Sequence, residues 1–211
     1  MGGRVTDGGR FGPIEWWVAG RALPGEDASG DEAVAIDVDG RAVVFGVIDG
    51  LGHGPAAASA ARRAASVVGE HVTQPLDQVL DACHRKLVAT RGAAVTLARV
   101  DFDTSTLQWT GVGNVTAALV SRTSSGLAAT SFVRLSGGIV GFQMPRILAS
   151  QTIEMHPGHL LVMATDGITD DHLEGLGFAA SAEAIANRIL GEHTRVTDDA
   201  LVLVARHRGV A

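Results

Sequence analysis

The stretch that decides the fold lies at residues 42–55 and reads Ala-Val-Val-Phe-Gly-Val-Ile-Asp-Gly-Leu-Gly-His-Gly-Pro. Its first part is apolar and rich in β-branched side chains, which predicts a buried strand over 42–48. Asp49 follows the strand among glycines, and Pro55 suits the first turn of a helix that we expect to reach about Glu70. The pattern therefore places a carboxylate at a strand end, directly before a helix.

The rest of the chain predicts a set of strands with few helices. An Asp-Gly pair at 39–40 separates the strand at 42–48 from another at 33–38, which is a strong hairpin signal. Because strands and helices are grouped and do not alternate, we expect an α+β fold of antiparallel sheets with helices packed outside. The other expected elements are strands at 15–21, 93–102, 106–111, 115–122, 130–135, 147–155, 160–165 and 200–206, and helices at 75–89 and 180–190.

Residues 1–13 differ in composition from the rest of the chain. Residues 1–13 hold five glycines and end at Pro13, so we expect a flexible leader there. Residues 14–211 are then expected to form a single domain, since the sequence contains no linker and no internal repeat.

Composition excludes several classes of protein. The chain has 211 residues, of which 46% are hydrophobic and 19% charged, and these values exclude a disordered chain. Its net charge of −6, without a dense basic stripe, argues against a nucleic-acid partner. No apolar run is long enough to span a membrane, and Cys83 is the one cysteine, so a disulfide framework is impossible. We therefore expect a cytoplasmic protein with no membrane partner.

Carboxylates recur at the ends of the predicted strands. An Asp-Gly pair taken alone is an ordinary turn, but repetition beside long apolar runs favours a shared site. Carboxylate oxygens suit hard cations such as Mg²⁺ and Mn²⁺, and a group of carboxylates without a cation would repel one another. The carboxylates in question are Asp31, Asp49, Asp166, Asp198 and Asp199.

The ordered set of motifs resembles the metal-dependent PPM-type serine/threonine phosphatases, in the SpoIIE/RsbU/RsbX branch. Each motif alone is weak, but their order is specific, and together they cover about residues 15–206. No sensor-like region precedes them, which favours the compact RsbX type. The matching segments are 29–31, 47–54, 91–95, 111–115, 137–141, 164–168 and 198–202.

This resemblance implies an αββα sandwich with two Mn²⁺ or Mg²⁺ ions per chain. By position, Asp49 would bridge the two metals and take part in catalysis. The Gly50 carbonyl and Asp31 would serve one metal, and Asp166 and Asp198 the other. Two metals about 3.5–4 Å apart can activate a hydroxide for attack on a phosphate, so no nucleophilic side chain is needed.

Some positions depart from the eukaryotic members of the family. Leu51 replaces a histidine that is proposed as their general acid, and His53 is our candidate substitute. No arginine stands between Arg21 and Asp31 to bind phosphate, and Asn114 replaces an aspartate that supports a third metal. Asp199 is a further metal-ligand candidate.

The resemblance implies hydrolysis of phosphoserine or phosphothreonine on STAS-domain regulators of the RsbS/RsbR kind. The setting would be a partner-switching or stressosome pathway that controls a sigma factor during stress. The alternatives are an RsbU-like phosphatase acting on an anti-anti-sigma factor, and a pseudophosphatase that only binds. A dinucleotide-binding enzyme is disfavoured, because Pro55 occupies the third glycine position of the phosphate-binding turn.

Overall fold

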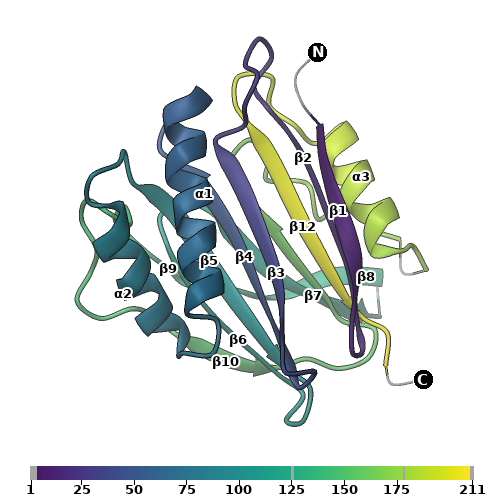
Figure 1. Ribbon diagram of the computed structural model, residues 1–211. Coiled ribbons are helices and arrows are strands. Elements are labelled where there is room, and N and C mark those ends of the chain that lie inside the picture. The colour runs from purple at the N-terminus through teal and green to yellow at the C-terminus, as the bar shows by residue number, and fades with distance from the viewer. Residues whose placement is uncertain (1–3, 125, 178, 210–211) are drawn as a thin grey trace.

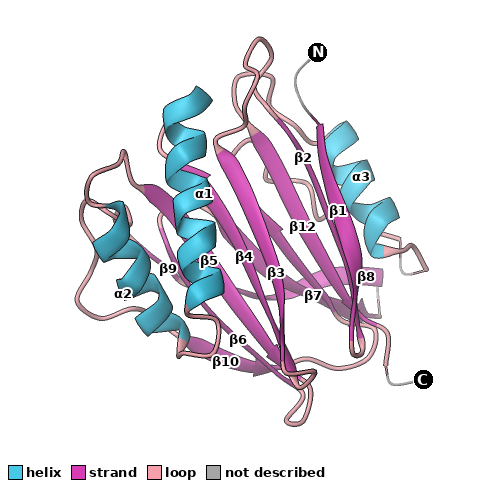
Figure 2. Ribbon diagram, in the orientation of Figure 1, coloured by secondary structure: helices cyan, strands magenta, loops and turns pink. Residues whose placement is uncertain are grey.

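The computed structural model of the protein describes residues 4–124, 126–177 and 179–209. Two β-sheets pack face to face, and helices cover the outer face of each (Figures 1 and 2). The layers therefore run helix, sheet, sheet, helix, which confirms the predicted α+β sandwich.

One sheet joins both ends of the chain. Its strands are antiparallel, and the last described strand, β12 (Ala200–His207), lies between β2 (Ile14–Arg21) and β11 (Leu160–Ala164) with every residue buried. In order across the sheet, the strands are β1 (Arg4–Phe11), β2 (Ile14–Arg21), β12 (Ala200–His207), β11 (Leu160–Ala164), β7 (Thr116–Thr123) and β8 (Gly126–Phe132).

The other sheet contains β4 (Ala42–Gly50), the strand of the 42–55 stretch, directly beside the edge strand β3 (Asp31–Val38). β3 and β4 are joined by the predicted tight turn, in which Asp39 has φ 53° and Gly40 φ 67°, and the Arg41 N–H donates to the Val38 carbonyl. The short β9 (Leu135–Ser136) pairs with β6 in parallel. The remaining order is β10 (Gln151–Glu154), β6 (Thr106–Val112), β5 (Ala93–Asp101), β4 (Ala42–Gly50) and β3 (Asp31–Val38).

In the described part of the chain, three helices complete the layers. α1 (Gly54–Glu70) and α2 (Leu76–Leu87) cover the sheet that contains β4, and α3 (Ala182–Glu192) covers the sheet that contains β12. α1 packs with a stripe of small residues at helical spacing, such as Ala57, Ala61 and Ala64, so it can approach the sheet closely. Among the described helices, none is both long and apolar enough to cross a bilayer.

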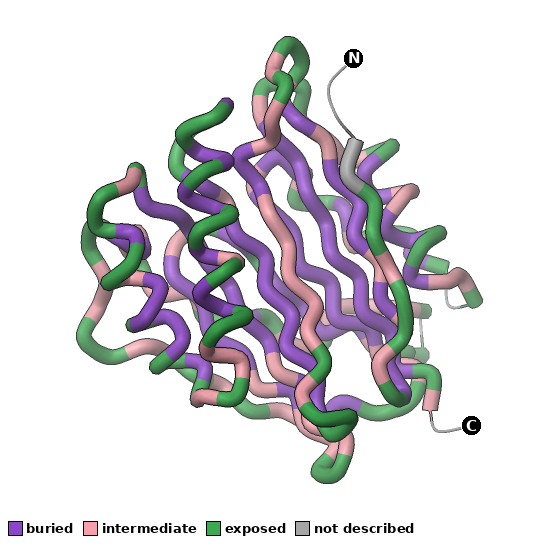
Figure 3. Tube along the Cα trace, viewed as in Figure 1, coloured by how far each residue is buried: buried purple, intermediate pink, exposed green. Residues whose placement is uncertain are grey.

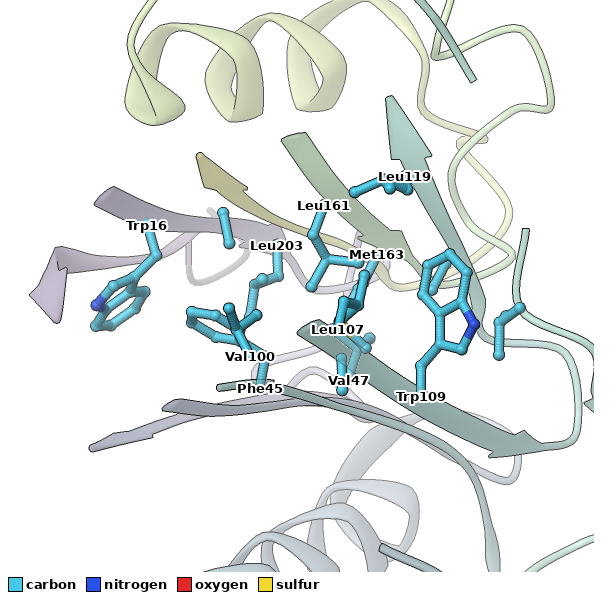
Figure 4. Packing of buried hydrophobic residues seen from close by; sticks show 14 of the residues in the cluster. Trp16, Phe45, Val47, Val100, Leu107, Trp109, Leu119, Leu161, Met163 and Leu203 are labelled. Atoms are coloured by element: carbon cyan, nitrogen blue, oxygen red, sulfur yellow. The ribbon is translucent and has the colours of Figure 1, made fainter. Parts of the chain in front are cut away.

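The main core fills the space between the sheets. Figure 4 shows Trp16, Phe45, Trp109, Met163 and Leu203 interdigitating there, and Figure 3 shows that the central strands are buried. Fully burying a side chain of this size stabilises a fold by about 1.5–3 kcal/mol. This core fixes how the two sheets face one another, and so fixes the relative positions of their strand ends.

The prediction of a flexible leader is wrong for residues 4–11, which form β1 and pair with β2 along its whole length. Gly8 lies opposite Trp17, and a Cβ at Gly8 would stand 2.0 Å from the indole ring. The glycine therefore makes room for a cross-strand tryptophan and does not loosen the chain. Residues 1–3 lie outside the described residues.

The strand predicted at 147–155 is also shorter than expected, since β10 spans only Gln151–Glu154. Ile147 is 87% exposed, so the apolar residues before β10 bury no face against the sheet. The segment before β10 instead forms a long loop, and its first residues line the candidate site.

Candidate active site

Strand ends from both sheets meet at one end of the sandwich. Asp31 opens β3 and pairs in register with Asp49 near the end of β4. In the other sheet, Asp166 follows β11, and Asp198 lies just before β12. Each sheet thus contributes two of the predicted carboxylates.

Thr165 ties the two sheets together at this end. Its hydroxyl donates to the Asp31 carboxylate at 2.8 Å and accepts the Leu201 N–H at 3.0 Å. Its backbone N–H donates to the Leu201 carbonyl at 3.0 Å. Thr165 and Asp31 are far apart in the sequence, so local pattern gave no signal for this contact.

A cleft of about 480 Å³ opens at these strand ends. Asp49, Asp166 and Asp198 line it and are only partly buried, so their carboxylates can reach a ligand. Asp31 is 7% exposed and lies behind them. The other lining residues are Leu51, Gly52, His53, Ala94, Gly113, Asn114, Gly137, Gly138, Ile139 and Thr197.

The carboxylates are held close enough to perturb one another. Burial, followed by repulsion from Asp49, raises the pKa of Asp31 well above its usual range. Burial, followed by repulsion from Asp166 and Asp198, raises the pKa of Asp49 to about 7. Burial also raises the pKa of Asp198. The protein therefore concentrates more negative charge here than it neutralises with its own cations.

This donor set fits hard divalent cations by its chemistry. The candidate ligands are all oxygen atoms, and a cation would relieve the repulsion that raises the pKa values. Among the described residues, no three aspartate, glutamate, histidine or cysteine side chains already stand at the spacing of a finished metal cage.

Asp199 is placed differently from its neighbour Asp198. It is 2% exposed, and its two carboxylate oxygens accept the backbone N–H groups of Leu23, at 2.7 Å, and Gly30, at 2.8 Å. Asp199 thus anchors the segment that leads into Asp31, and it does not line the cleft. Its observed contacts are those of a support for the predicted ligands.

Two glycines that follow carboxylates are required by close backbone packing. A Cβ at Gly50 would stand 2.2 Å from the Ala57 carbonyl oxygen in α1. A Cβ at Gly167 would stand 1.8 Å from the Asp199 carbonyl oxygen. Gly50 therefore lets α1 begin directly beside Asp49, and it lies behind the residues that line the cleft.

His53 lies on the cleft wall and immediately precedes α1. Its Nδ1 is 2.8 Å from the Glu26 carboxylate, and its side chain is 59% exposed. Asn114 also lines the cleft, and its amide donates to the Asp166 carboxylate at 2.7 Å. Nothing in the local sequence pointed to Glu26, since it lies in a loop before β3.

Two arginines that the sequence did not single out support the second pair of carboxylates. Arg195 donates to the Asp166 carbonyl at 2.9 Å. Arg21 donates to the Arg195 carbonyl at 2.6 Å and to the Asp198 carbonyl at 3.3 Å. These bonds hold the backbone on which Asp166 and Asp198 are carried.

Solved structures share this architecture. One, described as "The bacterial stressosome: a modular system that has been adapted to control secondary messenger signaling", is 31% identical, with a TM-score of 0.81 over 92% of this chain and 99% of that one. RsbX in complex with magnesium is 22% identical, with a TM-score of 0.79 over 95% and 98%. The PstP catalytic domain with two manganese ions is 14% identical, with a TM-score of 0.66 over 92% and 97%.

Among curated proteins, phosphoserine phosphatase RsbX of Bacillus subtilis (strain 168) is 25% identical over 178 residues, which cover 83% of this chain and 85% of that protein. Fold and relatives together define a phosphatase domain of the PP2C type. The chain belongs to the family of stage II sporulation protein E (SpoIIE), whose model matches residues 39–208. The resemblance noted in the sequence motifs is thereby confirmed.

Proposed function

We propose that this chain is a metal-dependent phosphatase acting in the cytoplasm on phosphoserine or phosphothreonine of STAS-domain regulators, in a stressosome or partner-switching pathway. The observation that carries the proposal is the cleft into which both sheets direct carboxylates of raised pKa. The likeness to RsbX, which is named a phosphoserine phosphatase, and to a structure whose description concerns the bacterial stressosome supports the choice of substrate.

We further propose that the site holds two Mn²⁺ or Mg²⁺ ions, with Asp49 between them. The Gly50 carbonyl and Asp31 would complete one side, and Asp166 and Asp198 the other. The ions would lower the pKa of a bound water and offset the charge of the phosphoryl oxygens. Related structures that contain magnesium or two manganese ions support this assignment.

His53 is our candidate for the group that protonates the leaving serine or threonine oxygen. Glu26 contacts Nδ1, so the hydrogen bond fixes the ring and leaves Nε2 for the substrate. Asn114, through its bond to Asp166, would keep that carboxylate turned toward the cleft wall.

Cys83 is not a suitable nucleophile, and this supports attack by water. The thiol is fully buried beneath α1, with its sulfur 3.8 Å from the Ala64 carbonyl oxygen. Burial raises the pKa of this thiol to about 12, so it stays protonated at neutral pH.

The test is hydrolysis of p-nitrophenyl phosphate and of a phosphorylated STAS-domain protein in the presence of Mn²⁺ or Mg²⁺. We expect Asp49→Asn and Asp166→Asn each to lower kcat by about 100-fold or more, because both remove charge that would hold the ions. Arg62→Gln, an exposed change on α1, is the matched control and should keep wild-type activity.

Two results would contradict this proposal. Full activity in both aspartate variants would exclude the metal mechanism. Binding of the phosphorylated STAS-domain protein without any hydrolysis by the wild-type protein would identify a binding module in place of an enzyme.

A further inference from the structure

A second cavity, of about 350 Å³, lies beside the cleft, between the first turns of α1 and the loop that joins α2 to β5. We call it the basic cavity. Its lining consists of Ala56, Ser59, Arg63, Ala89, Thr90 and Arg91.

The basic cavity shares a wall with the cleft. A methyl group placed on Gly52 would stand 3.1 Å from a guanidinium nitrogen of Arg91. The Leu51 N–H donates to the Gly92 carbonyl at 3.0 Å, so the two loops are joined at this wall. Leu51 and Gly52 themselves line the cleft. A group bound in the basic cavity would therefore lie next to a group bound in the cleft.

The turn that carries Arg91 is fixed in place. The Thr90 hydroxyl donates to the Leu87 carbonyl at 2.7 Å and accepts the Gly92 N–H at 3.0 Å. The Leu51–Gly92 bond holds the far side of the same turn. Arg91 is thus presented from a rigid base while its side chain stays exposed.

The cleft is lined by acidic side chains, and the basic cavity is lined by arginines. No acidic side chain is among the residues that line the basic cavity. Within the described ranges, the guanidinium groups of Arg63 and Arg91 make no hydrogen bond or ion pair. Two arginines that lack carboxylate partners and share a cavity with the Ser59 hydroxyl are suited to an anion, because guanidinium binds carboxylate and phosphate through paired hydrogen bonds.

We infer that the basic cavity is an anion subsite for the substrate protein, in which Arg63 and Arg91 bind a carboxylate or a second phosphate that lies near the phosphorylated residue. This inference rests on the proposed function and adds a substrate preference to it. The subsite selects phosphoproteins whose phosphorylated residue has an anionic neighbour. Small phosphate esters, which carry no such neighbour, do not use it.

The experiment compares phosphoserine peptides of equal length with neutral flanks, with glutamate at successive flanking positions, and with a second phosphoserine at the same positions. We expect the wild-type protein to hydrolyse the best anionic peptide with kcat/KM about tenfold above that of the neutral peptide. The double variant Arg63→Gln/Arg91→Gln should reduce this ratio to about one while p-nitrophenyl phosphate hydrolysis stays within about twofold of wild type.

Arg62→Gln is the control, since Arg62 is exposed on the same helix but does not line the basic cavity; it should keep the preference. A preference for glutamate peptides identifies a carboxylate as the bound group, and a preference confined to doubly phosphorylated peptides identifies a phosphate. Either result supports the subsite.

The inference is overturned if the wild-type protein shows no preference, or if the preference survives in the double variant, while p-nitrophenyl phosphate is still hydrolysed. If the wild-type protein hydrolyses nothing, the proposed function fails instead. Fluorescence anisotropy of labelled peptides then tests the subsite alone. Tighter binding of anionic peptides to the wild type than to the double variant supports it, and equal binding overturns it.

Discussion

The two sheets meet in two different ways along the same interface. Over most of their length they bury apolar side chains such as Phe45 and Trp109, and this burial favours folding. At one end they bring together Asp31, Asp49 and Asp166, whose negative charges repel one another. The stability of the core is what allows the other end to hold an arrangement that is unfavourable until a cation binds.

We expect the largest effect when a large side chain is removed from the apolar core between the sheets. Phe45→Ala removes a fully buried ring between the sheets, and we expect it to lower the free energy of unfolding by about 3–5 kcal/mol. Urea unfolding followed by circular dichroism measures the change. A loss below about 1 kcal/mol would show that the core does not hold the sheets together as described.

The next effect is a rise in the free energy of unfolding, and it concerns the end of the interface at which the carboxylates meet. In metal-free protein, Asp49 has a pKa of about 7 when folded and 3.8 when unfolded, so the folded state keeps a proton that the unfolded chain loses. The contribution of Asp49 to the free energy of unfolding is therefore fully present below about pH 4 and is lost as the pH rises from there to about 7. Asp49→Asn removes this loss, and we expect it to stabilise metal-free protein at pH 8 by as much as about 4 kcal/mol.

The measurement is urea unfolding of both proteins in a chelator at pH 5 and pH 8. The gain from Asp49→Asn should be larger at pH 8 than at pH 5. A gain that is the same at both pH values would contradict the raised pKa.

We expect a smaller change in stability at Thr165, which links the two sheets at the end where the carboxylates meet. Thr165→Val keeps the shape of the side chain but removes the hydroxyl that links Asp31 to the opposite sheet, and it leaves the Leu201 N–H without its acceptor. We expect a loss of about 1–2 kcal/mol in unfolding free energy, together with weaker Mn²⁺ binding. Thr165→Ser, which restores the hydroxyl, should recover most of both, and its failure to do so would rule out the hydrogen bond as the cause.

The smallest effect is expected for the buried thiol. Because burial raises the pKa of Cys83 to about 12, we expect no reaction with a thiol reagent in the native protein and full reaction in urea. Absorbance of the released reagent anion follows the reaction, and rapid native labelling would contradict the packing of α2 against α1.

The sequence predicted those parts of the fold that local pattern controls. The turn at Asp39-Gly40 and the helix that begins beside Pro55 are specified by their own residues, and both are confirmed. The sequence does not predict β1, because its glycines are typical of a flexible segment, whereas in the structure Gly8 leaves space for Trp17 across the strand pair. That space depends on a partner strand, which composition alone does not indicate.

The candidate site could likewise be predicted from the sequence only in part. Aspartates at strand ends were visible in the sequence because strand ends are local features. Their supports were not visible, because the contacts of Thr165 with Asp31, of Glu26 with His53 and of Arg21 with the segment before β12 join distant parts of the chain. Asp198 and Asp199 are adjacent in sequence, yet only the structure separates a residue on the cleft wall from one that holds two backbone amides.

Calorimetric titration of Mn²⁺ into metal-free protein tests most directly whether cations balance the charged end of the interface. We expect the wild-type protein to bind two ions per chain, and the Asp49→Asn/Asp166→Asn double variant to bind neither with measurable heat at the same concentrations. A wild-type protein that binds no Mn²⁺ or Mg²⁺, or a double variant that binds both ions as tightly as the wild type, would contradict the assignment of these carboxylates.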